Sequence, residues 1–136
     1  MLNTDKIENK IKLLSEKLLT KFSQKKDDVE LLRYYFLDAI NQFIEGSYEM
    51  AYFSAYKIIR ERTIVDPKEY VSDKRNGEPS SFSEIRSILM HSRVKDTKVS
   101  PKKIRDIKVK LPEYTVEIIQ RASELIEKLA SDEYGE

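Results

Sequence analysis

The sequence predicts an all-α protein, an antiparallel bundle of about five helices with a long loop before the fourth. Two observations predict this class, and the chain length predicts a single domain. The chain contains only three glycines and four prolines, so few residues interrupt regular structure. Apolar residues recur every three or four positions in most segments, which is the period of an α-helix. The 136 residues are enough for one core, so we expect residues 1–136 to form a single domain.

Each of the first two expected helices carries one apolar face. In the first helix the apolar side chains are spaced by three or four residues: Ile7, Ile11, Leu14, Leu18 and Phe22. The second helix starts at the acidic pair Asp27 and Asp28, ends near Gly46, and has a similar stripe: Val29, Leu32, Phe36, Ala39, Ile40 and Phe43. Because the connection between the two helices is short, we expect them to pack antiparallel.

The third expected helix, from Ser47 to Ile59, is apolar around nearly its whole circumference, which predicts a central position. Its main stripe consists of Tyr48, Ala51, Tyr52, Ala55 and Ile59, and the alanines allow close helix packing. Three further side chains lie off this stripe and need a second covering surface: Met50, Phe53 and Tyr56. Either another subunit or a later helix of the same chain would provide that surface.

The second half of the chain alternates between polar connections and helices. Residues 63–80 contain Pro67, Gly77 and Pro79 and predict a long exposed loop. Ser81 and Glu84 have the spacing of a capping box, so the fourth helix should begin near Phe82. Its core-facing residues would be Phe82, Ile85, Ile88 and Leu89. We expect another connection at residues 96–111 and a final helix from Pro112 with apolar positions Val116, Ile119, Leu125, Ile126 and Leu129.

Composition excludes several classes of function. The chain has no cysteine and one histidine, which rules out disulfides and thiolate sites and makes a zinc site implausible, so we expect neither metal nor cofactor. Charged residues make up 36% and sum to a formal +1, so net charge does not indicate a partner. No run of about 18 apolar residues occurs, which predicts no membrane association and a cytoplasmic protein.

The single histidine, His91, follows Arg86 by five residues in the fourth helix. Histidine exchanges a proton near neutral pH, whereas the arginine fork binds phosphate, so the pair suits phosphodiester chemistry. In a straight helix the two residues lie about 140 degrees apart. Between them lies a small patch of Ser87, Met90 and Val94. If two copies met over Met90 and Val94, Arg86 and His91 would flank the contact in a composite homodimer site.

Neighbouring residues extend this candidate site. Arg93 lies about 20 degrees from Arg86 on the helix, so the two would form a row that grips phosphate. Arg93 and Lys95 also open a segment, residues 93–110, with eight basic and two acidic residues, where RNA backbone would bind if the side chains converge. A solvated connection is the alternative. Glu84 would either orient the His91 imidazole or cap the helix.

The stretch "DAINQFIEGSYEMAYFSAYKIIRERTIV", a loop, and then a helix with R-x4-H resemble the HEPN superfamily (higher eukaryotes and prokaryotes nucleotide-binding domain). The resemblance covers roughly the second helix to the last, and the Arg86 to His91 spacing matches the family's R-x4-6-H signature. It implies a dimeric helical bundle of HEPN type. Many members are metal-independent endoribonucleases of toxin-antitoxin, antiviral or RNA-processing systems, so the resemblance implies that Arg86 and His91 are catalytic.

Two positions depart from the family pattern. Ser87 stands where active members often have Asn, Asp or His, and Arg93 stands where a toxin subgroup paired with nucleotidyltransferase antitoxins has tyrosine. The arginine at that position argues against pairing with such an antitoxin, which stays an alternative together with another protein partner. A catalytically inactive HEPN-like module that binds a nucleotide or assembles with a partner is also an alternative. A third possibility, a plain helical scaffold, predicts no pocket at His91 and predicts Met90 and Val94 buried within one chain.

Overall fold

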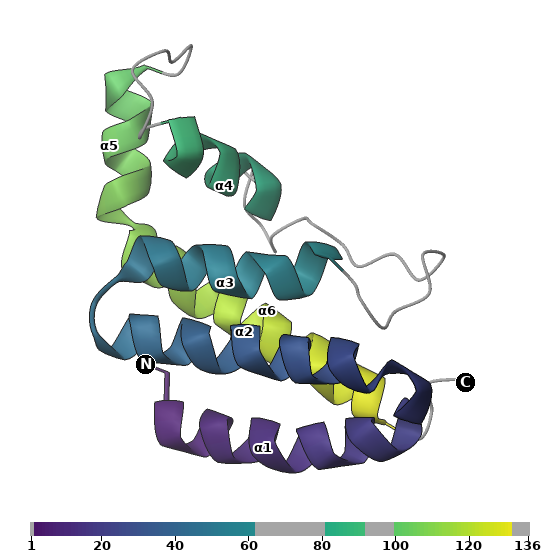
Figure 1. Cartoon of the computed structure of the whole chain (residues 1–136). Coiled ribbons are helices and arrows are strands. Elements are labelled where there is room, and N and C mark those ends of the chain that lie inside the picture. Colours follow the sequence, from purple (N-terminus) through teal and green to yellow (C-terminus); the bar gives the residue numbers. More distant parts are fainter. Residues whose placement is uncertain (1, 62–80, 92–99, 132–136) are drawn as a thin grey trace.

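The computed structural model describes residues 2–61, 81–91 and 100–131, and for Glu61 and His91 it describes the backbone only. These residues form six α-helices and one short 3₁₀-helix, and they contain no strand. The all-α class predicted from the apolar period is therefore confirmed, and the helices pack together as a bundle (Figure 1). The long loop expected at residues 63–80 lies outside the described residues.

Helices α1 (Thr4–Lys21) and α2 (Lys26–Ile44) run antiparallel and are joined by the 3₁₀-helix η1 (Ser23–Lys25) (Figure 1). The expected apolar stripes face the core, where Ile11, Leu18, Phe36 and Ile40 are essentially inaccessible to solvent. The acidic pair at the start of α2 lies in its first turn, where carboxylates favour the positive end of the helix dipole. The predicted pairing of the first two helices is confirmed.

Helix α3 (Tyr48–Glu61) packs against both α2 and α6 (Leu111–Ala130), so it is the central helix that the sequence predicts. Gly46 permits the turn from α2 into α3, because its φ of 81° is one that side chains disfavour. Ala51, Tyr52, Ala55 and Ile59 are fully buried. The Thr115 hydroxyl of α6 also lies against the start of α3: its Oγ1 is 3.3 Å from the Tyr48 carbonyl oxygen and 2.7 Å from the Leu111 carbonyl oxygen of its own helix.

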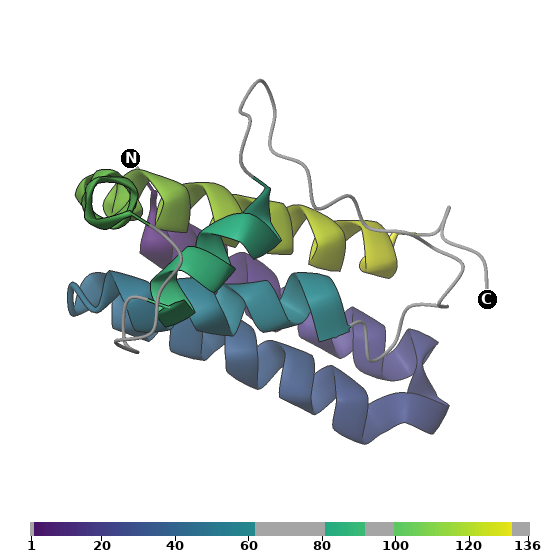
Figure 2. The same ribbon diagram turned by 90° about the horizontal axis from the view of Figure 1, so that it is seen from above.

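Helix α4 (Phe82–His91) lies against α3 on the side away from α1 (Figure 1 and Figure 2). It begins at the predicted residue because Ser81 caps it: Ser81 Oγ accepts a hydrogen bond from the Glu84 amide at 3.1 Å. All four expected core residues are buried: Phe82, Ile85, Ile88 and Leu89. The buried Tyr52 hydroxyl donates to the Phe82 carbonyl at 2.8 Å and so fixes the start of α4 on α3.

Residues 101–109 are helical, which corrects the expectation of a connection at 96–111. Helix α5 (Pro101–Val109) begins with proline at its first position, and Ser100 Oγ accepts a hydrogen bond from the Lys103 amide at 3.2 Å. Its apolar face is short, and Ile107 is its only buried residue. The many basic residues therefore made this segment resemble a polar connection in the sequence. Figure 1 shows α5 rising away from the bundle from the start of α6.

No helix in the described ranges has the length and apolar character needed to cross a membrane.

Candidate phosphate site between α3 and α4

Helix α3 has a second, outward-facing stripe beside its buried one. Phe53, Tyr56, Lys57 and Arg60 follow one another at helical spacing, and all but the exposed Lys57 are half-buried. The core contacts of α4 turn the opposite side of that helix outward, so that Arg86 and Met90 lie one turn apart and face this stripe. The two helices therefore form a groove from residues far apart in the sequence.

These six residues line a hollow of about 230 Å³, called here the α3–α4 hollow: Phe53, Tyr56, Lys57, Arg60, Arg86 and Met90. Pockets for drug-sized ligands commonly have volumes of about 300–1,000 Å³. The α3–α4 hollow is smaller, so it suits one compact chemical group with an attached ring better than a large ligand.

The electrostatic character of the hollow is strongly positive. Lys57, Arg60 and Arg86 contribute three cations, and none of the six lining residues is acidic. The Arg86 guanidinium carbon lies 5.5 Å from the centre of the Tyr56 ring, and Lys57 Nζ lies 4.9 Å from that of Tyr35. These cation–π contacts hold the side chains in place without neutralising their charge. Ion pairs to these three cations are absent within the described residues, so the hollow favours an anion.

Arg60 supplies the most unusual atom of the hollow. Its Nη1 is buried and has no hydrogen-bond partner in the described part of the chain. Buried polar atoms are nearly always hydrogen-bonded, because an unsatisfied one has lost its water without compensation. An arginine nitrogen can only donate, so the atom that would satisfy it must be an acceptor.

The structure describes the side chains of only some residues that the sequence predicts for the site. Arg86 lies at the hollow, and His91 is the last residue of α4, five positions further along. Ser87 is exposed on the same helix. The side chain of His91 and all of Arg93, Val94 and Lys95 lie outside the described residues.

Glu84 is exposed, and its Oε1 lies 3.3 Å from Lys103 Nζ of α5. Its carboxylate therefore links α4 to α5. Its backbone amide, by contrast, takes part in the cap formed by Ser81. Both contacts fit a role for Glu84 in placing α4.

Met90 remains 41% exposed, and Met50 on α3 is 45% exposed. The plain-scaffold alternative predicted that Met90 would be buried within one chain, and that part of its prediction is wrong. Of the side chains that needed a second covering surface, Phe53 and Tyr56 are half-buried at the hollow, partly under α4. Both methionines thus keep part of their side-chain surface exposed.

Sequence reasoning missed Lys57, Arg60 and Tyr56 as site residues. The available indication was the spacing of Phe53, Tyr56, Lys57 and Arg60, which places two cations and two rings on one face of a helix. That spacing does not reveal which other helix faces the stripe. Only the packing of α4 on α3 brings Arg86 to these residues.

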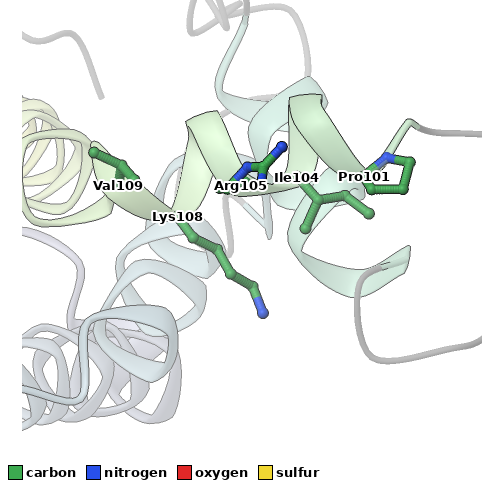
Figure 3. Close-up of a pocket in the computed structure, with 5 residues that line it drawn as sticks. All are labelled: Pro101, Ile104, Arg105, Lys108 and Val109. Carbon is green, nitrogen blue, oxygen red and sulfur yellow. The ribbon is translucent and has the colours of Figure 1, made fainter.

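A second basic surface lies on α5, where Arg105 and Lys108 flank exposed apolar side chains. Figure 3 shows these residues along one side of the helix: Pro101, Ile104, Arg105, Lys108 and Val109. They border an open hollow of about 470 Å³. The exposed Lys102, Lys103 and Lys110 add to its charge. Part of the predicted basic segment is therefore a helix face.

No protein-family model, curated protein or solved structure matches the chain. The α3–α4 hollow combines cationic donors with aromatic faces, which are the groups that bind phosphate and stack on a base.

Proposed function

We propose that this chain is a metal-independent endoribonuclease of HEPN type, in which Arg86 and His91 act on a phosphodiester of RNA. One observation carries the proposal: Arg86 lies with Lys57 and Arg60 at a hollow whose six described lining residues include no carboxylate. Its helix ends at His91, the only histidine of the chain. The motif thus stands beside an anion site formed by other residues.

The proposed reaction uses the 2'-hydroxyl of the RNA as its nucleophile. His91 accepts the proton of that hydroxyl as the oxygen attacks the adjacent phosphorus, and the bond from phosphorus to the 5'-oxygen breaks. The leaving 5'-oxygen takes up a proton from water, and His91 returns its proton to solvent, which gives a 2',3'-cyclic phosphate and a 5'-hydroxyl. Arg86 stabilises the negative charge that grows on the phosphoryl oxygens, which is the largest contribution such a site usually makes.

A second copy of the chain completes the site in this proposal. Arg86 and His91 lie about 140 degrees apart on a straight helix, so one copy does not present both to the same phosphate. Met90, between them, is exposed and apolar enough to lie at a twofold contact. Arg86 of one copy and His91 of the other would then face a shared cleft.

The second candidate function is a catalytically inactive module of the same fold that binds a nucleotide or RNA. The lining of the hollow favours it, because its cations and rings suffice for binding, and the six described lining residues include no histidine or carboxylate. Ser87, exposed next to Arg86, cannot supply a charge either. This candidate predicts RNA binding without cleavage.

The deciding experiment incubates an end-labelled RNA pool with the protein in EDTA. Wild type, Arg86→Ala and His91→Ala are compared with Arg105→Ala, a control that removes an arginine outside the hollow. Circular dichroism and solution mass establish equal folding and oligomeric state. We expect cleavage with 2',3'-cyclic phosphate ends by the wild type and the control only.

Two results would overturn the ribonuclease proposal. Equal cleavage by all four proteins would mean that a contaminant or another site is responsible. RNA binding by the wild type without any cleavage would favour the inactive binding module. A solution mass of one chain for a cleaving wild type would remove the composite site and require both residues to act within one copy.

A further inference from the structure

Arg60 is the residue of the α3–α4 hollow that the HEPN-type signature does not account for. It lies in the last turn of α3, is half-buried, and carries a buried Nη1 without a hydrogen-bond partner among the described residues. A guanidinium has five donors in a rigid planar fork and remains charged at all relevant pH values. Such a group calls for an acceptor, and an anionic acceptor at the hollow that Arg60 lines would also offset its charge.

The other cations restrict what this anion can be. Arg86 and Lys57 line the same hollow, and among its described lining residues no carboxylate offsets their charge. A phosphate group offers several acceptor oxygens and matches the arginine fork with two parallel hydrogen bonds. A carboxylate has two oxygens and one charge, which leaves part of this cationic set without an acceptor.

The apolar half of the hollow indicates what is attached to the phosphate. Phe53, Tyr56 and Met90 line it beside the cations. Aromatic side chains bind unpaired bases by stacking, a mode typical of single-stranded RNA. A volume of about 230 Å³ has room for a phosphate with part of one nucleoside.

We propose that the α3–α4 hollow binds one nucleotide unit of single-stranded RNA, with its phosphate on Arg60 and its sugar or base against Phe53 and Tyr56. Arg60 is thus a substrate-binding residue contributed by α3, distinct from the arginine of the R-x4-H pair. The identity of the ligand as RNA rests on the proposed function. The phosphate site itself rests on the cations and the burial of Arg60.

The first test measures binding without any chemistry. The probes are adenosine 5'-monophosphate, inorganic phosphate and adenosine, added to the full chain labelled with ¹⁵N. The side-chain Nε–Hε signal of Arg60 is assigned by its loss in Arg60→Gln. We expect it to shift with the nucleotide and with inorganic phosphate, and to stay in place with adenosine. An unmoved Arg60 signal at nucleotide concentrations that saturate other shifts would overturn the proposal.

The second test compares matched variants by nucleotide affinity. Because hydrogen bonds to charged groups are among the stronger ones, Arg60→Gln should weaken nucleotide binding by roughly tenfold or more. Arg60→Lys, which keeps the charge and loses the fork, should give an intermediate value. Arg105→Gln on α5 removes the same charge outside the hollow and should change affinity less than about twofold. The reverse ranking of Arg60→Gln and Arg105→Gln would place the phosphate on α5 and overturn the proposal.

A third measurement separates this inference from the proposed function. RNA cleavage by Arg60→Gln should show a raised KM with a smaller change in kcat, as expected for a residue that binds substrate. Unchanged kcat and KM alongside full wild-type cleavage would refute the role of Arg60 and leave the ribonuclease intact. Nucleotide binding on Arg60 in a protein that never cleaves RNA would refute the ribonuclease and leave the phosphate site intact.

Discussion

The two basic surfaces of this protein differ in how their charges are held. On α5, Lys102, Arg105 and Lys108 are exposed, and Lys103 pairs with Glu84. In the α3–α4 hollow, Arg60 is half-buried, the exposed Arg86 and Lys57 pack on the rings of Tyr56 and Tyr35, and none of the six described lining residues is acidic. Water and salt screen exposed charges, whereas partly buried ones are screened much less. We therefore expect α5 to attract RNA without selecting it, and the hollow to bind one group in a defined position.

The largest expected difference between these surfaces concerns cleavage. Arg86→Ala should lower kcat for RNA by about 100-fold to 1,000-fold, the usual effect of removing one donor that stabilises developing charge. Arg105→Ala should change kcat little, because an exposed charge on α5 does not touch the reacting phosphate. Single-turnover cleavage with saturating protein measures this directly. Similar losses in both variants would mean that the two surfaces act as one site.

The next largest effect is a loss of stability when the hydrogen bond that fixes α4 on α3 is removed. Tyr52→Phe removes the hydroxyl that bonds to the Phe82 carbonyl and leaves the volume nearly unchanged. The free energy of unfolding should fall by about 1 kcal/mol, as measured by urea denaturation. The signals of Arg60 and Arg86 should shift together in this variant, because the hollow depends on the placement of α4. A stability equal to the wild type would show that apolar packing alone places this helix.

Replacing Arg60 should raise the free energy of unfolding, whereas Tyr52→Phe lowers it. Arg60→Met replaces a half-buried guanidinium with an apolar side chain, so the free protein should become more stable by roughly 0.5 kcal/mol, the low end for replacements at functional sites. Thermal unfolding without ligand measures this gain. A loss of stability would indicate that Arg60 holds the fold together and is not kept for binding. Arg33→Met on α2, also half-buried, serves as the matched control.

The smallest expected effect is on the RNA affinity contributed by the exposed cations of α5. Lys108→Ala should weaken the binding of single-stranded RNA about twofold and lower the slope of log affinity against log salt concentration by about 0.7, the value for one phosphate contact. Fluorescence anisotropy at several salt concentrations measures both quantities, with His91→Ala as the background in order to prevent cleavage. An unchanged slope would remove α5 from the RNA path and leave its charges as a solvated face.

Only some residues of the candidate site could be predicted from the sequence. Arg86 and the start of α4 follow from local features, namely the R-x4-H spacing and the Ser81 cap. Arg60 and Lys57 do not, because their spacing on α3 is also that of an ordinary solvated face. Helix α5 was missed for a similar reason: Ser100 and Pro101 mark a helix start, but Ile104 and Ile107 are too few to show a clear apolar period.

By itself, the sequence determined the helical class, the buried faces of its helices and the turn at Gly46. These depend on the spacing of neighbouring residues and on the freedom of one glycine, which are local properties. Only the tertiary structure decided that the outward stripe of α3 faces Arg86 and Met90 of α4. Helix packing is set by the shape of buried surfaces from distant segments, and that packing turned three ordinary surface cations into one positively charged hollow.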